Sequence, residues 1–310
     1  MLHHKIIWQF VVTSLILTTI SCSVQKRQER YRERLLIEGN NGSGPGELKW
    51  AILADGLPYG PSSFAIDNKA DVFVVDDLND RIAKFDRDGK YIGSIMPISP
   101  RQINDIAFDT RDNLYIRLSK EIAVYDSNDV LKRMIKFKKG YSVVRIDITV
   151  NGTILTQDPD PSQHGHILEL DTMGVVISGK LDLLYFIECR GEYFVREWRS
   201  GTTTRQSDSI YDKHGRPIFS IRSLNYSEII GIDSLLNTYI VLHNYEPKTS
   251  ENYLLKVNTG GKIIAHFNIK NSSGSADVSR TMRVSNSGHV YVLDGGPTRK
   301  YQLWEYYPVK

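Results

Sequence analysis

The stretch that decides the fold reads Phe64-Ala65-Ile66-Asp67, then Val72-Phe73-Val74-Val75-Asp76-Asp77-Leu78-Asn79-Asp80-Arg81-Ile82, then Lys84-Phe85-Asp86-Arg87-Asp88-Gly89-Lys90. Its apolar residues are mostly β-branched or aromatic and stand in short runs between polar residues, which is the pattern of short strands. Asp86 opens a hairpin turn, and Gly89 stands where such a turn needs a positive φ. The stretch therefore predicts consecutive short antiparallel strands.

The same turn recurs along the chain. Further copies open at Asp126, Asp171, Asp212 and Asn258, so the openings are 40 to 46 residues apart. Two more strand-like runs precede each turn, and nothing in residues 40–310 has the period of a long amphipathic helix. Because four short strands repeated at this spacing are typical of radially packed blades, the sequence predicts an all-β fold, a six-bladed β-propeller.

The last repeat lacks one strand. Only three residues follow Gln302–Tyr307, whereas the strand-like run Arg34–Glu38 precedes the first complete repeat. We expect this N-terminal strand to pair with the last one and to close the sixth blade. The propeller domain then spans residues 34–310.

The first repeat resembles an NHL repeat. That family combines a glycine-rich lead-in, a VxD strand, an N-x-R-I segment and an FDxxGK turn, and this chain matches all four within residues 42–90. The later repeats keep the strand spacing and lose most of the motif. The resemblance implies a propeller in which Asp76 or Asp77, together with Arg81, braces the blade.

The N-terminus has the pattern of an export signal. Ile6–Ile20 is apolar but shorter than the roughly 20 residues of a spanning helix, so residues 1–21 are predicted to be a signal peptide. The following Thr19-Ile20-Ser21-Cys22 resembles the lipobox of bacterial lipoproteins, although that family prefers Leu where this chain has Thr19. The resemblance implies acylation of Cys22, with palmitate among the acyl groups, and membrane anchoring. Ser23 favours the outer membrane, and an ordinary secretory signal is the alternative.

The positive charge of the chain is concentrated near this anchor. The formal net charge is +3, but six of the 39 Lys and Arg residues and two of the 36 Asp and Glu residues lie in the first 34 positions. Residues 22–33 are therefore predicted to be a charged tether, and the remainder is close to neutral. A neutral body excludes a broadly cationic nucleic-acid binder. Two cysteines exclude a disulfide-dense scaffold.

Unequal loops suggest where a propeller of this kind would bind a ligand. The predicted connections between second and third strands are tight in the first two repeats and longer in the others, at residues 158–165, 199–207, 244–251 and 295–300. Long loops on a rigid frame often carry function, and aromatic and Arg side chains are common interface anchors. The candidates for this ligand face are Trp198, Arg199, Arg205, Tyr245 and Arg299. Each of them also fits a solvated hairpin tip.

One loop carries residue types that bind metals. Asp158, His164 and His166 lie close together, but their spacing matches no common site and the intervening prolines favour a plain loop. We therefore expect no metal and no cofactor.

Enzymes on similar propellers, such as streptogramin lyases, amidating lyases and calcium-dependent lactonases, offer another interpretation. They use metal ions or inward-pointing His, Arg and Tyr residues. Here His243, with Arg283 or Tyr291, is the candidate set for a central channel, and His289 also stands near the end of a predicted second strand. The common hydrolase, metalloprotease and nucleotide-binding motifs are absent from the sequence.

The sequence thus predicts a lipid-anchored protein whose propeller binds a protein or a surface ligand at the cell envelope. A propeller lyase or hydrolase with a metal- or His-based site in the channel is the alternative.

Overall fold

The computed structural model describes residues 29–97, 103–137, 146–149, 151–157, 166–171, 176–182, 185–189, 192–199, 206–211, 217–223, 227–242, 251–270 and 280–309. Over these ranges the chain is almost entirely β-strand, with a single-turn 3-10 helix at Asp77–Asn79. No helix in them is long and apolar enough to cross a membrane.

Six four-stranded antiparallel sheets make up this described part, and a separate two-stranded sheet precedes the first. The first two sheets are β4 (Phe64–Ile66), β5 (Val72–Asp76), β6 (Arg81–Phe85) and β7 (Tyr91–Ile95), then β8 (Asp105–Phe108), β9 (Leu114–Arg117), β10 (Glu121–Tyr125) and β11 (Leu131–Lys136). The next two are β12 (Ile146–Ile148), β13 (Ile154–Gln157), β14 (His166–Leu170) and β15 (Val176–Asp182), then β16 (Tyr185–Cys189), β17 (Glu192–Arg199), β18 (Gln206–Tyr211) and β19 (Pro217–Ser223). The last two are β20 (Ser227–Ile232), β21 (Thr238–Leu242), β22 (Glu251–Val257) and β23 (Ile263–Lys270), then β24 (Met282–Val284), β25 (Val290–Gly296), β26 (Arg299–Val309) and β1 (Arg30–Gly39).

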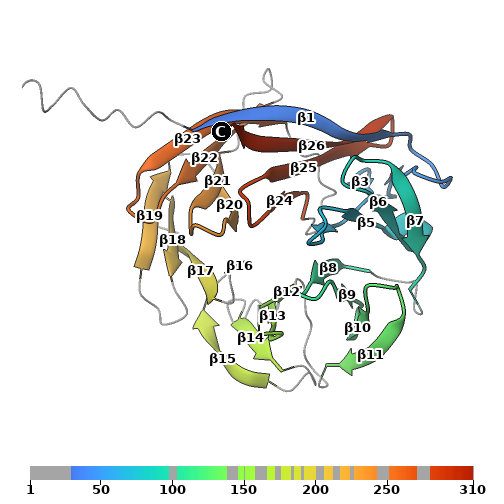
Figure 1. The fold of residues 1–310 in the computed structure, drawn as a ribbon, viewed down its shortest axis with the longest axis horizontal. Helices are drawn as coiled ribbons and strands as arrows, with labels where there is room; N and C mark the ends of the chain where they lie inside the picture. Colours follow the sequence, from blue (N-terminus) through green and yellow to red (C-terminus); the bar gives the residue numbers. More distant parts are fainter. Residues whose placement is uncertain are drawn as a thin grey trace, which may run out of the picture.

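The sheets follow one another around a central axis (Figure 1). Strands β4, β8, β12, β16, β20 and β24 begin their sheets and lie nearest the axis, whereas the fourth strand of each sheet lies at the rim. Apolar side chains fill the space between neighbouring sheets. Phe64 and Phe85 of the first sheet pack with Leu293 and Leu303 of the sixth, for example. Each such side chain contributes about 1.5–3 kcal/mol by leaving water.

The expected pairing of the two ends of the chain is confirmed. Strand β1 lies antiparallel to β26, from Arg30 opposite Val309 to Gly39 opposite Tyr301. The strand begins at Arg30, four residues before the boundary expected from charge density. Tyr31 explains the difference, because its ring stacks on Phe267 with centroids 4.3 Å apart.

The predicted hairpin turns are confirmed where the structure describes them. The amide of Gly89 donates to the carbonyl of Asp86 at 2.8 Å, and the turns opening at Asp126 and Asn258 repeat this bond. Gly89 has a φ of 84° and Asp129 a φ of 62°, so the residue in this position adopts the left-handed conformation. The copies opening at Asp171 and Asp212 continue into residues outside the described ranges.

The structural role expected for the first repeat is also confirmed. Asp76 is fully buried and accepts a bond from Arg81 Nε at 2.9 Å. The same guanidinium donates to the carbonyl oxygens of Gly44 and Glu47 at 3.0 and 2.7 Å. A buried charge needs this kind of pairing, and here the pair fixes the glycine-rich lead-in against the blade.

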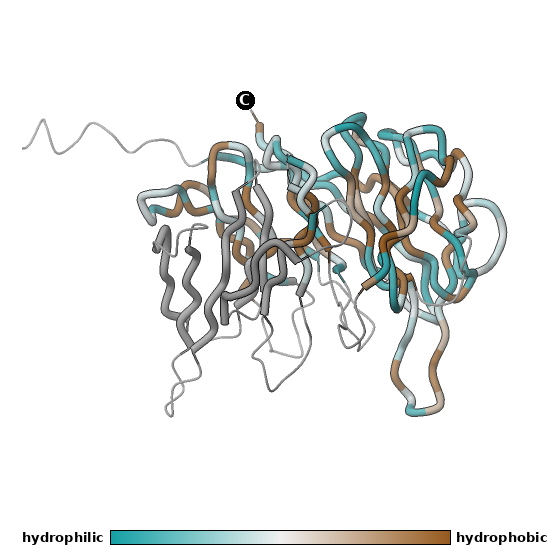
Figure 2. Tube along the Cα trace, turned by 90° about the horizontal axis from the view of Figure 1, so that it is seen from below, coloured by the Kyte–Doolittle hydropathy of each residue, from teal (hydrophilic) through white to brown (hydrophobic). Residues whose placement is uncertain are grey.

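One element was not predicted. Strands β2 (Ala51–Ile52) and β3 (Pro58–Tyr59) form a hairpin between β1 and the first sheet. Figure 2 shows this hairpin projecting from the ring, and it carries the exposed side chains of Ile52, Leu53 and Leu57. The run is too short to stand out as a strand pair in the sequence.

Candidate functional site

A cavity of about 630 Å³ is lined mainly by the sixth and first sheets, with further residues from the second, third and fifth. Its lining includes Asn68 and Ser287, which lie where first strands turn into second strands. In an antiparallel sheet this end lies opposite the second-to-third loops, on which the sequence placed the ligand. The cavity is therefore on the other face of the ring from the expected one.

A row of polar side chains crosses the sixth sheet and forms one wall of the cavity. Arg283 of β24 pairs in register with Tyr291 of β25, Tyr291 with Glu305 of β26, and Glu305 with Arg34 of β1. Residues directly opposite each other in a sheet point to the same face. The register therefore places all four side chains on one face, in a row from the axis to the rim.

Glu305 connects this row to a histidine. His289 Nδ1 lies 2.7 Å from Glu305 Oε1, and the Tyr291 hydroxyl donates to the same oxygen at 3.1 Å. Arg34 Nε donates to Glu305 Oε2 at 2.9 Å. Burial alone would raise the pKa of Glu305, but the bonds from His289 and Arg34 outweigh it and hold that pKa below its usual value.

This arrangement fixes the histidine tautomer. An ionised carboxylate only accepts hydrogen bonds, so His289 Nδ1 carries the proton that faces Glu305. In the neutral form of this imidazole, Nε2 has a lone pair that can accept a hydrogen bond from another partner. Because His289 lines the cavity, that partner can be a molecule bound there.

Burial and the carboxylate also act on the tyrosine. Burial first, and then the charge of Glu305, raise the pKa of Tyr291 above its usual value. The hydroxyl therefore stays protonated and remains a hydrogen-bond donor to Glu305.

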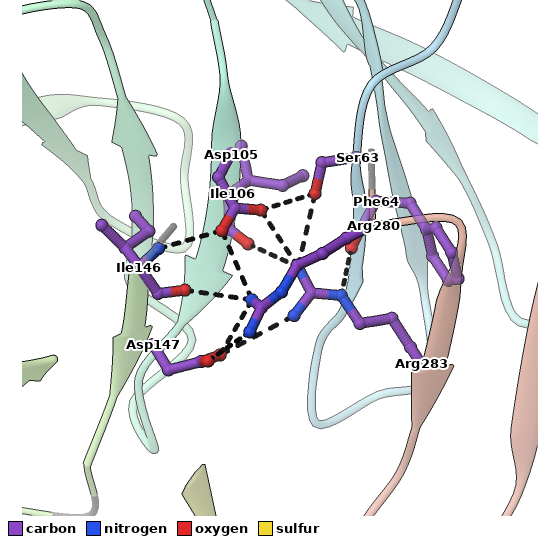
Figure 3. A network of polar contacts seen from close by, with 8 residues as sticks. All are labelled: Ser63, Phe64, Asp105, Ile106, Ile146, Asp147, Arg280 and Arg283. Atoms are coloured by element: carbon purple, nitrogen blue, oxygen red, sulfur yellow. Dashed lines mark hydrogen bonds and ion pairs between the residues drawn. The ribbon is translucent and has the colours of Figure 1, made fainter. Parts of the chain in front are cut away.

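A buried ionic network links the innermost strands of neighbouring sheets (Figure 3), and two of its members, Arg283 and Asp147, also line the cavity. Asp105 of β8 is paired with Arg280 at 3.3 Å and with Arg283 at 3.2 Å, and it accepts a bond from the Ser63 hydroxyl at 2.6 Å. Asp147 of β12 is paired with the same two arginines. The network thus joins the sixth sheet to the first, second and third across the centre.

Opposite charges hold this network together. Burial alone would raise the pKa of the Asp105 carboxyl, but Arg280 and Arg283 hold it below its usual value. Two carboxylates are therefore paired with two guanidiniums, and the buried guanidinium of Arg117 also interacts electrostatically with Asp105.

The metal ions of propeller lactonases do not fit this arrangement. A metal would have to displace Arg280 and Arg283 before it could use Asp105 and Asp147 as ligands, because both carboxylates are already paired. In the described ranges, no group of three or more His, Cys, Asp or Glu residues could hold a metal ion. We therefore derive no step through a metal.

Two of the three residues expected for an enzymatic channel meet in the cavity. Arg283 and Tyr291 line it together, whereas His243 lies outside the described residues. His289 supplies the imidazole next to Tyr291, with ring centroids 6.4 Å apart.

The expected ligand face is described only in part. Trp198 and Arg199 end strand β17, so Arg199 belongs to a strand rather than to the loop. Arg205 and Tyr245 lie outside the described residues.

The prediction of a long loop at residues 295–300 is wrong. Gly296 pairs with Arg299, so a turn of two residues joins β25 to β26. The Arg299 guanidinium donates to Asp294 at 2.7 and 2.9 Å. Because Asp294 and Arg299 lie on the two strands that this turn connects, their ion pair stabilises the turn.

The structure does not test the remaining candidate residues. Asp158, His164 and Cys22 lie outside the described ranges, and His166 opens strand β14.

Sequence reasoning missed Glu305 and Arg34. The sequence did carry a signal for them, because each is a charged residue that interrupts an aromatic or apolar run of a predicted strand. Only the register of β1 against β26 shows that they meet.

Comparison with known proteins places the fold. No protein-family model and no curated protein matches the chain, so the NHL resemblance of the first repeat stays a prediction. Among solved structures, a gluconolactonase from Xanthomonas campestris matches with a TM-score of 0.53 and 12% identity, covering 89% of this chain and 99% of that one. A structural-genomics target provisionally named a gluconolactonase matches with a TM-score of 0.50 and 10% identity, covering 90% and 92%. Both are β-propellers, and the chain shares that fold.

Proposed function

We propose that this protein is a propeller hydrolase that cleaves an ester or lactone in the cavity of the sixth sheet, with His289 as general base. The observation that carries the proposal is the 2.7 Å contact between His289 Nδ1 and Glu305 inside a cavity of about 630 Å³. The fold shared with gluconolactonases supports an enzyme better than the binding module expected from the sequence. Their reaction gives the first substrate class to test.

The chemistry follows from the tautomer of His289. Its Nε2 takes a proton from a water molecule, and the resulting hydroxide adds to the carbonyl carbon of the ester. Glu305 stabilises the imidazolium that forms, since it is ionised and bound to Nδ1–H. The carbon–oxygen bond to the leaving group then breaks, and His289 returns the proton to the departing alkoxide.

Positively charged side chains stabilise the negative charge that develops on the carbonyl oxygen. Arg34 lines the cavity beside Glu305, and the exposed Arg87 lines it from the first sheet. Arg87 makes no ion pair with any other residue in the described ranges. Guanidinium groups beside the reacting carbonyl stabilise the oxyanion that forms there.

The proposal places this enzyme in a six-bladed propeller anchored to the outside of a bacterial membrane, with the outer membrane favoured. Six four-stranded sheets and the pairing of β1 with β26 support the blade number. The export signal and Cys22 support the anchor. Mass spectrometry of the mature N-terminus should find acyl groups on Cys22. An unmodified amine at another residue would contradict the anchor.

The enzymatic proposal is tested by substitution of the base. We expect His289→Asn to lower kcat/KM for a chromogenic ester or for glucono-δ-lactone by about 10²–10⁴-fold, the usual contribution of a general base. The matched control is His266→Asn, because His266 is exposed on β23 and outside the cavity. Equal activity of the two variants, both folded by circular dichroism, would refute the role of His289.

A further inference from the structure

The exit end of the ring, where β1 begins, is fixed by a buried lysine. The amide of Glu29 donates to a backbone carbonyl of β23 at 2.9 Å, and its carboxylate pairs with Lys256 Nζ at 2.7 Å. Lys256 is buried and also pairs with Asp233 at 3.3 Å. Arg30 then pairs in register with Val309 at the end of β26. The chain that precedes Glu29 is therefore attached at this end of the ring.

The opposite end of the ring carries the β2–β3 hairpin. Strand β1 runs from Arg30 to Gly39, and its ten residues span about 33 Å. Figure 2 shows the hairpin projecting at the end of the ring opposite the C-terminus. Only the seven residues 22–28 join the predicted anchor to Glu29, and they reach at most about 25 Å in any conformation. Because this reach is shorter than β1, an anchor at Cys22 holds the hairpin end away from the membrane.

The exit end carries exposed apolar side chains. Leu235 lies in the turn between β20 and β21, Ile263 begins β23, and Val309 ends β26. Their exposed fractions are 71%, 42% and 38%. Turns that join first to second strands and third to fourth strands lie at one end of an antiparallel sheet, so all three residues belong to the exit end. Apolar side chains gathered on one exposed face mark a site of interaction with a protein or a membrane.

Basic side chains accompany this apolar group. Arg30 is exposed opposite Val309 on the paired strand, and Lys262 is exposed directly before Ile263. Residues 22–28 add two basic residues and no acidic one. Each basic residue beside an anionic membrane contributes about 1 kcal/mol of attraction, which is about fivefold in binding. The charge of the exit end therefore complements anionic lipid headgroups.

From the short reach of the chain and this charge, we propose that the exit end of the ring lies on an anionic membrane surface. The contact patch consists of Arg30, Leu235, Lys262, Ile263 and Val309. The inference rests on the anchor at Cys22 in the proposed function and not on the hydrolysis. The apolar side chains enter the headgroup region, and the basic ones remain beside the phosphates. Asn68 and Ser287, which line the cavity, also lie at this end, so that part of the cavity wall is on the membrane side.

Energy transfer to a labelled lipid headgroup tests the orientation. The mature acylated protein, extracted from membranes, is reconstituted on vesicles of phosphatidylcholine and phosphatidylglycerol that contain a rhodamine-labelled lipid. A donor dye is attached to Asn128→Cys or to Ala54→Cys, each in a Cys189→Ser background. Asn128 is exposed in a turn at the exit end, and Ala54 is exposed in the hairpin. We expect more efficient transfer from position 128; equal transfer, or more from position 54, would overturn the inference.

Loss of one positive charge tests the patch. Lys262→Gln should lower the ratio of docked to undocked rings about fivefold, and so reduce the transfer from position 128. Lys49→Gln is the matched control, because it removes the same charge from an exposed lysine between β1 and the hairpin. Vesicles of phosphatidylcholine alone should also reduce the transfer. The same transfer in the wild type and in both variants would overturn the inference.

Flotation separates the inference from the anchor. If the protein floats with the vesicles but position 54 is nearer to the lipid than position 128, the anchor stands and the inference fails. If the protein does not float with the vesicles, the anchor and the inference both fail. Neither outcome affects the proposed hydrolysis, which His289→Asn tests.

Discussion

Replacement of Asp105 by Asn is the sharpest test of the axial network. The carboxylate is 1% exposed, is paired with two arginines, and accepts bonds from the Ser63 hydroxyl and from the Ile146 amide at 2.9 Å. Removing one partner of a buried ion pair leaves an uncompensated charge and typically costs about 3–5 kcal/mol. The amide keeps some of the hydrogen bonds, so we expect a loss near the lower end, about 3 kcal/mol.

Thermal and urea unfolding measure this loss. For a domain of this size about 3 kcal/mol corresponds to a drop in Tm of roughly 5 °C. The control is Asp129→Asn, since Asp129 pairs with Lys84 at the surface and is 41% exposed, and such pairs are worth less than about 1 kcal/mol. A loss for Asp105→Asn no larger than that of the control would refute the structural role of the network.

The same variant has a defined pH dependence. The folded-state pKa of Asp105 lies below its unfolded value, so its stabilisation is complete above the unfolded pKa of about 3.9 and is lost as pH falls through the folded value. The difference in unfolding free energy between wild type and variant should therefore be constant near neutrality and shrink below about pH 4. A difference that grows on acidification would contradict the assignment.

Two further predictions concern the first repeat. Gly89→Ala should lower the free energy of unfolding in urea by more than about 2 kcal/mol, because φ is 84° and a Cβ would lie 1.8 Å from the Leu36 carbonyl oxygen. The control Gly56→Ala has a similar φ of 82° but open space around the Cβ, so it should cost only about 1 kcal/mol. Equal losses for the two variants would refute the close approach at Gly89. Burial raises the pKa of Asp77 to about 7, so the folded state becomes less stable as pH rises from about 4 to 7 and this carboxyl ionises in the unfolded chain. Asp77→Asn should remove about 2–4 kcal/mol of that decline, as measured by urea unfolding at a series of pH values. An unchanged decline would show that Asp77 is not its source.

The fold was predictable because local signals repeat. Each hairpin turn at Asp86, Asp126 and Asn258 is set by a few residues, and their spacing specifies four-stranded units. The pairing of β1 with β26 followed from a missing strand in the last repeat. Its start at Arg30 did not, because the stacking of Tyr31 on Phe267 is a contact between distant residues.

The site was less predictable, since it depends on register. Arg283 and Tyr291 were candidates because some propeller enzymes use inward-pointing Arg and Tyr residues. The partnership of His289 with Glu305 joins two strands whose alignment is not specified by the residues themselves. The ligand face expected from loop length stays a prediction, because most of its loops lie outside the described residues. Loop length drew attention to one end of the strands, whereas the cavity at the other end is formed by side chains of the innermost strands and of the sixth sheet.

A crystal structure of the protein with the carboxylate product of a hydrolysed ester bound tests the central claim most directly. We predict that the carboxylate lies in the cavity of the sixth sheet, within hydrogen-bond distance of His289 Nε2. A carboxylate bound on the opposite face of the ring, among the second-to-third loops, would contradict the account.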